Sequence, residues 1–165
     1  MKLVLFALLF VSGMANAQRI SIKKLIALQN NTFTQAETYL NQQGWDYESS
    51  EKPTDSTVGM TTWSYGKGDD QQAEAWFMLI NPSKDQKRVH YQFIDKQLYI
   101  QMEKDLAAMG YKRDKTKLKT DSMEKIYAKG NLTVILEQSA SSKTSYMYDV
   151  TVLTSVDYLI NFYKK

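Results

Sequence analysis

A helix pattern that ends in a glycine and an aromatic residue occurs twice in this chain. The first junction reads YLNQQGWDY, through Gly44, and the second reads DLAAMGYKR, through Gly110. Glycine just after the last helical residue is typical of a helix C-terminus, because that position often has a left-handed backbone. The two junctions predict a helix over 34–44, with a capping box of Thr34 and Glu37, and a helix around 98–109.

The segments that follow the two junctions also correspond. Each half contains three further strand patterns in the same order: 61–68 with 124–131, 73–81 with 132–139, and 87–95 with 146–154. The first of these pairs ends in a Lys-Gly turn, which equates Gly68 with Gly130. The order predicts an α+β fold of two tandem helix-plus-antiparallel-sheet units, with the helices packed on one sheet face.

Three segments complete the predicted organisation: a signal peptide over 1–17, a first α/β unit over 18–94, and a second unit over 95–165. A short helix is expected over 20–29, before the first helix of the repeat. The second unit ends in a closing helix over 155–165, with four apolar residues on one face: Val156, Leu159, Ile160 and Tyr163.

Residues 1–17 have the pattern of a secretory signal peptide. Lys2 precedes a continuous apolar run over 3–11, and Ala15-Asn16-Ala17 fits the small-x-small cleavage rule. The run is shorter than the ~20 residues that a membrane-spanning helix needs. We therefore expect an exported protein, periplasmic or secreted, whose mature chain begins at Gln18.

Composition excludes several classes of function. The 165 residues include no cysteine and one histidine, so disulfide scaffolds, thiol catalysis and transition-metal sites are not expected. The 21 basic and 18 acidic residues give a net charge of +3, which is too small to suggest a nucleic-acid partner. We expect no cofactor and no stable membrane anchor after cleavage.

Catalytic patterns are weak. His90 lies on a strand with no serine beside it, which favours a solvent-facing side chain over a base that activates a nucleophile. Asp69 and Asp70 could bind a hard cation weakly, but a solvated turn explains them better. The lysine-rich stretch 112–125 fits either a surface for an anionic partner or an edge strand that lysines protect from aggregation.

Tyrosine and tryptophan lie on most of the predicted strands. They fit a core between sheet and helices, and they equally fit an exposed binding patch. Period-2 alternation predicts which side chains of strands 87–95 and 146–154 point away from the helices. The candidate binding surface combines these with two aromatic anchors from a neighbouring strand: Trp63, Tyr65, His90, Gln92, Met147, Asp149 and Thr151.

The signal peptide, the segment ISIKKLIALQNNTFTQAETYLNQQGW and the second DLAAMGY step resemble small uncharacterised exported proteins of Gram-negative bacteria with a tandem helix-plus-meander repeat. This resemblance covers nearly the whole chain and implies no activity or site. In layout the chain also resembles the β-lactamase inhibitor proteins, in which two helix-plus-four-strand units form a concave sheet. Those proteins typically carry a disulfide in each unit, which this chain lacks, so no inhibitory residue carries over.

These observations favour an exported, non-enzymatic binding or interaction protein of the cell envelope, with another envelope protein as its partner. Two alternatives remain: an envelope hydrolase that uses a carboxylate pair, and a structural assembly factor. A hydrolase should bring two carboxyl groups together in a pocket.

Overall fold

A computed structural model describes residues 19–54, 58–69, 72–83, 86–142 and 145–163. The predicted signal peptide lies outside the described residues, as does Asp70 of the predicted cation turn. The helices are α1 (Ile22–Asn30), α2 (Phe33–Gln42), α3 (Lys96–Ala108) and α4 (Ser155–Asn161). The strands are β1 (Asp46–Glu51), β2 (Gly59–Tyr65), β3 (Ala75–Ser83), β4 (Gln86–Phe93), β5 (Lys112–Leu118), β6 (Ser122–Lys129), β7 (Leu132–Ala140) and β8 (Tyr146–Thr154).

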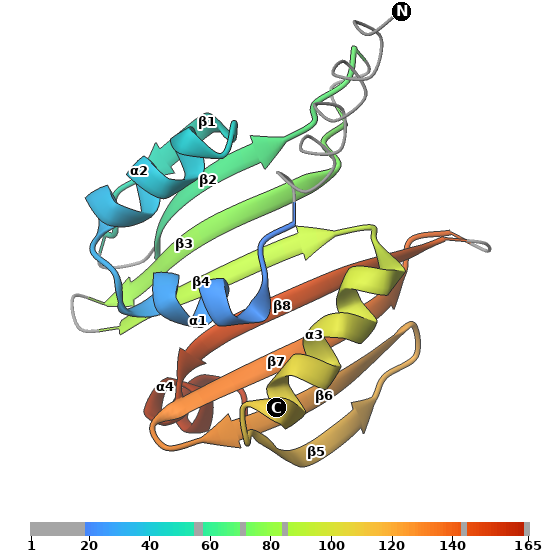
Figure 1. Ribbon diagram of the computed structural model, residues 1–165. Helices are drawn as coiled ribbons and strands as arrows, with labels where there is room; N and C mark the ends of the chain where they lie inside the picture. The colour runs from blue at the N-terminus through green and yellow to red at the C-terminus, as the bar shows by residue number, and fades with distance from the viewer. Residues whose placement is uncertain (1–18, 55–57, 70–71, 84–85, 143–144, 164–165) are drawn as a thin grey trace, which may run out of the picture.

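All eight strands form one antiparallel sheet in the order β1-β2-β3-β4-β8-β7-β6-β5 (Figure 1). Strands β1–β4 come from the first unit and β5–β8 from the second, and the units join where β4 pairs with β8, for example at Val89 opposite Val152. The predicted α+β fold of two helix-plus-sheet units is confirmed. Asp95, the first residue assigned to the second unit, is the N-cap of α3.

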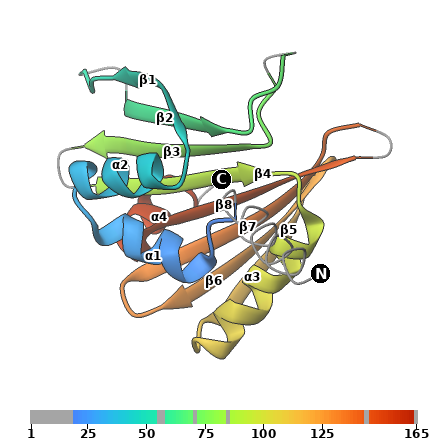
Figure 2. The same cartoon turned by 45° about the horizontal axis from the view of Figure 1, so that its top comes forward.

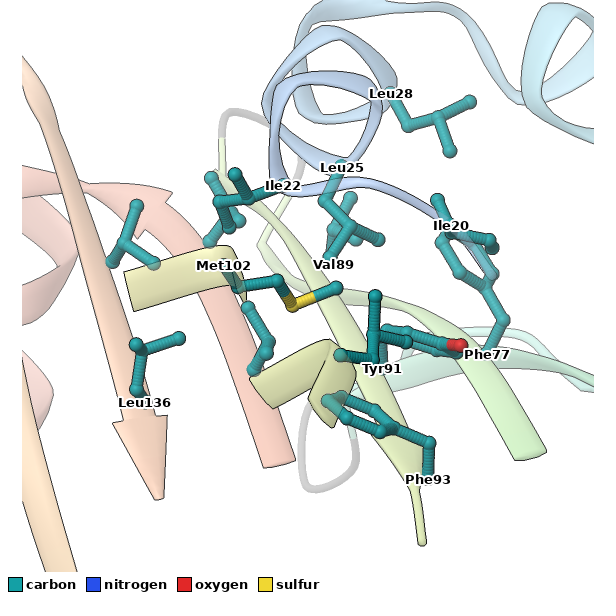
Figure 3. Packing of buried hydrophobic residues seen from close by; sticks show 14 of the residues in the cluster. Ile20, Ile22, Leu25, Leu28, Phe77, Val89, Tyr91, Phe93, Met102 and Leu136 are labelled. Carbon is teal, nitrogen blue, oxygen red and sulfur yellow. The ribbon is translucent and has the colours of Figure 1, made fainter. Parts of the chain in front are cut away.

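Helices α1, α2 and α3 lie on the same face of the sheet (Figures 1 and 2). Alternation along each strand sends every second side chain into the layer between this face and the helices. Leu25 of α1 and Met102 of α3 meet Val89 and Tyr91 of β4 and Leu136 of β7 in that layer (Figure 3). This core spans both units and holds them as one packed body.

The opposite face, which we call the open face, carries α4 over part of the second unit (Figure 1). Tyr158 of α4 packs there on Ile126, Ile135 and Leu153. The predicted C-terminal helix is confirmed, but its apolar face does not pack on the sheet. That face is exposed: Val156 63%, Leu159 53%, Ile160 63% and Tyr163 51%.

The helix ends follow the expected chemistry, with one difference in detail. Gly44 and Gly110 follow α2 and α3 with φ of 76° and 80°, the left-handed conformation that favours glycine. The capping box of α2 is made by Thr32 and Gln35, so the predicted Thr34–Glu37 box is wrong; the helix begins earlier than expected.

A further correction concerns the glycine predicted to correspond to Gly130. Gly130 has φ 59° directly after β6, and the glycine directly after β2 with φ 65° is Gly66. Gly68 does not hold that position, because β2 ends at Tyr65 and the turn begins at the next residue, Gly66.

Candidate binding surface on the open face

The structure places five of the seven predicted surface residues on the open face. Their neighbours along β4 and β8 point into the helix-covered core, so alternation directs these five to the other side. All five are half-buried: His90, Gln92, Met147, Asp149 and Thr151.

The two predicted aromatic anchors lie on the wrong face. Trp63 is 0% exposed and belongs to the helix-covered core, and Tyr65 packs against the same core. The physical reason is the alternation of β2 itself. Trp63 and Tyr65 share one side of the strand, while the polar Thr62 and Ser64 share the other.

Four of the open-face residues form a hydrogen-bonded cluster across β4 and β8. His90 Nε2 and Gln92 Nε2 both lie 3.0 Å from Asp149 Oδ1, and His90 Nδ1 lies 3.0 Å from Thr151 Oγ1. If the Asp149 carboxylate accepts from Nε2–H, Nδ1 accepts from the Thr151 hydroxyl. The cluster therefore fixes the side chains at the junction of the two units.

A hydroxyl, an imidazole and a carboxylate in a row is also the arrangement of a catalytic triad, in which the imidazole is the base for the hydroxyl and the carboxylate orients the imidazole. No serine or threonine neighbours His90 along the sequence, and Thr151 comes from a strand that is distant along the chain. Strand β8, however, pairs with β4 on one side and β7 on the other, so its ladder amides are committed to neighbouring strands. This stretch of β8 offers no spare N–H donors for an oxyanion, and we assign the cluster no catalytic role.

The cluster belongs to a continuous row of side chains that crosses the open face at right angles to the strands. The pairing register connects one residue from each strand, from β1 to β5: Asp46, Ser64, Trp76, Gln92, Asp149, Glu137, Glu124 and Lys117. We call this set the transverse row. It joins an aromatic residue, several carboxylates and a terminal lysine on one rigid support.

Ion pairs balance the carboxylates near both ends of the transverse row. Hydrogen bonds from Ser64 and then Lys67 hold the pKa of Glu48, which lies beside the row on β1, below its usual value. At the other end, Lys119 bonds to Glu124 and lies 3.7 Å from Glu137. The hydrogen bond to Glu124 raises the pKa of Lys119.

Glu124 and Glu137 also bear on the hydrolase alternative, because they are direct cross-strand neighbours in one cavity. The cavity has a volume of about 730 Å³ and opens beside the C-terminal end of α4, with Ile160 and Phe162 among its lining residues. A carboxylate pair that cleaves a bond must leave room between the acids for the substrate. Here the Lys119 ammonium contacts both carboxylates, so the geometry favours a charge network over a catalytic pair.

The first unit leaves an apolar part of the open face uncovered. Met60, Met78 and Ile80 lie together on the paired strands β2 and β3, and Trp76 lies one alternate position further along β3. All four side chains are half-buried. The corresponding part of the second unit is covered by α4, which packs on Ile126, Ile135 and Leu153. A tryptophan and two methionines on a rigid sheet are typical of interface surfaces.

Sequence reasoning missed Trp76, Met78 and Ile80 for a physical reason. Residues 75–80 of β3 read AWFMLI, so both faces of the strand are apolar and alternation does not distinguish them. The polar side of β2, in contrast, predicts the open face of the sheet. Thr62 and Ser64 indicate which face of the sheet is open.

Other types of site find no support among the described residues. They contain no group of three or more His, Asp or Glu side chains that could hold a metal ion. None of the described helices is both long and apolar enough to cross a bilayer. Comparisons with protein-family models, with curated proteins and with solved structures gave no match for this chain.

Proposed function

We propose that the chain is an exported, non-enzymatic binding protein of the cell envelope and that its partner docks on the open face. The observation that carries the proposal is the uncovered patch of Trp76, Met78, Met60 and Ile80 beside the His90 cluster. Tryptophan and methionine are enriched at protein interfaces, and ordered polar groups beside them give specificity.

The build of the sheet supports this use of the surface. The patch and the polar cluster lie on strands that pair on both sides, over a core that helices cover from behind. Side chains on such a support lose little further freedom when a partner binds, which lowers the entropic cost of association. The face is therefore preorganised for docking.

Export rests on the predicted signal peptide. Arg19, just after the predicted cleavage site, forms an ion pair with Asp95 at 2.7 Å, so the folded part begins close to the expected mature end. Mass spectrometry of the exported protein should give Gln18 as the N-terminus. A mature protein that retains residues 1–17 would contradict the proposed localisation.

An internal repeat is the second part of the proposal. Both edge strands contain a register shift at matching places, between Tyr47 and Ser49 and between Arg113 and Lys115. Together with the equivalent glycines Gly44 and Gly110, these shifts support an origin of the two units from one helix-plus-meander sequence.

The proposed partner surface can be tested by co-purification from envelope fractions. Met78→Glu places a charge in the uncovered patch and should reduce partner recovery at least about tenfold, since a buried charge at an interface is costly. Lys104→Glu, on the exposed side of α3, is the control and should retain the partner. Equal recovery with both variants would contradict the proposal.

A further inference from the structure

Charges on the open face are separated to its two edges. On β1, the residues that pair with open-face positions of β2 are acidic or neutral. On β5, the residues that pair with open-face positions of β6 are basic. The edge groups on β1 are Asp46, Glu51 and Glu48, the last of which is paired with Lys67, and those on β5 are Lys112, Lys115 and Lys117. The open face therefore has an acidic edge and a basic edge.

The open face also carries two sets of apolar side chains, one on each side of its centre. The outer side of α4, with Ile160 at 63% exposure, stands over the second unit. Met60, Met78 and Ile80 lie on the first unit, in the rows of the sheet that continue to Ile126, Ile135 and Leu153 beneath α4. The uncovered patch and the exposed helix are thus at the same height along the strands.

We propose that the open face binds a second copy of this chain, about a two-fold axis parallel to β4 and β8. This inference rests on the proposed function of the open face and names its partner. Rotation about that axis exchanges the two edges, so β1 of each copy faces β5 of the other. The same rotation places the exposed side of α4 over the uncovered patch of the partner copy.

The positions of the edge charges fit this operation in register as well. Asp46 and Lys117 are the two ends of the transverse row, so the rotation places Asp46 of one copy opposite Lys117 of the other, whose Nζ also donates to the Phe162 carbonyl at 3.0 Å. Glu51 pairs with Met60 and Lys112 pairs with Ala128, at the opposite ends of a parallel row. One axis therefore matches Asp46 with Lys117 and Glu51 with Lys112, twice per dimer.

Edge-to-edge pairing of β1 with β5 would use the same charges but does not fit the strands. Each edge strand contains a register shift that interrupts its ladder, a feature that blocks pairing with another sheet. Edge pairing would also be heterologous and would build open chains of molecules. A face-to-face dimer uses the charges and closes on itself.

Sedimentation equilibrium of the mature protein tests the dimer directly. We expect a monomer–dimer equilibrium that weakens as salt concentration rises, because the edge charges are screened. Ile160→Glu should raise the dissociation constant at least about tenfold, since it places a charge in the apolar contact. Ala107→Glu, on the exposed side of α3, should leave the dissociation constant unchanged and shows that an added carboxylate alone has no effect.

A charge exchange tests the axis. Glu51→Lys and Lys112→Glu should each weaken the dimer by up to about fivefold at low salt, and the chain that carries both substitutions should recover it, because the pair is opposite in charge again. Two single variants that weaken the dimer without recovery in the double variant would contradict the two-fold axis.

Several results would overturn the inference. These are a monomer up to about millimolar concentration, open polymers in place of a closed dimer, and binding of the monomer to vesicles of anionic lipid through Ile160. The proposed function has a separate readout. If the protein is monomeric and Met78→Glu still loses its envelope partner, the dimer is wrong and the open face remains the binding surface.

Discussion

At the scale of single residues, the ends of α2 and α3 depend on glycine for its backbone. Gly110 has φ 80°, and an added Cβ would have Lys129 Nζ at 3.9 Å among its near neighbours, so space is available. The cost of a side chain is then conformational. Gly110→Ala should lower the free energy of unfolding by about 1–2 kcal/mol in urea titrations. Gly110→Asn should cost less, because asparagine tolerates this conformation; equal losses would contradict the explanation.

Glu103 on α3 links stability to pH. Burial raises its pKa, but hydrogen bonds from Lys125 at 2.6 Å and Tyr127 at 2.7 Å outweigh burial and hold the pKa below the usual 4.5. A lowered carboxyl pKa stabilises the fold above pH 4.5, and the contribution is lost as pH falls through the folded-state value.

Glu103→Gln should therefore destabilise the protein most near neutral pH. The difference in the free energy of unfolding between the wild type and the variant should shrink below about pH 4.5. Chemical denaturation curves at intervals of about one pH unit, from about pH 3 to about pH 7, measure this difference in the free energy of unfolding. A difference that is constant across this range would show that Glu103 acts through packing and not through its charge.

At the scale of elements, α4 is held to the sheet by a buried ion pair. Arg88 Nε and a terminal guanidinium nitrogen of Arg88 lie 2.6 Å and 2.7 Å from the two carboxylate oxygens of Asp157, which is 1% exposed. The Arg88 guanidinium also lies 5.0 Å from the centre of the Phe162 ring. Asp157 thus occupies the buried side of α4, and the apolar residues occupy its outer side.

Removing one partner of this pair should release the helix. Asp157→Ala leaves Arg88 without its carboxylate, and we expect a loss of up to about 3–5 kcal/mol, limited by the free energy of docking α4. Hydrogen exchange in α4 should rise while exchange in β4 stays slow. Arg88→Met with Asp157→Leu should recover much of the loss, because similar apolar side chains can replace a buried pair. Fast exchange of β4 in Asp157→Ala would contradict local release.

Local patterns predicted the helices well and the orientation of α4 badly. Glycines at 44 and 110 and the alternation of β4 and β8 depend on neighbours in sequence, so the two units and five open-face residues could be predicted. The orientation of α4 depends on Arg88, which is distant in sequence, and no periodicity within residues 155–163 records it. The pattern of α4 predicts that its apolar side packs on the sheet. In the structure, the side that carries Asp157 is buried and the apolar side is exposed.

At the scale of the whole molecule, the two faces of the sheet differ: three helices cover one face, and the open face is covered only in part. Helices α1–α3 and the main core occupy one face (Figure 2). The open face carries the transverse row, the His90 cluster and the uncovered patch. The two units contribute unequally, because α4 packs on Ile126, Ile135 and Leu153 of the second unit and reaches the edge of the first unit at Arg88. This asymmetry leaves Met60, Met78 and Ile80 of the first unit half-buried on the open face.

The most direct test of the open face is cysteine labelling in isolated envelope fractions, since the chain has no cysteine of its own. Met78→Cys reports on the uncovered patch, and Lys104→Cys reports on the exposed side of α3. The account predicts that maleimide labels both sites in dilute purified protein and that the envelope fraction protects only residue 78. Equal labelling of both sites in the envelope, or protection of residue 104 alone, would contradict a partner on the open face.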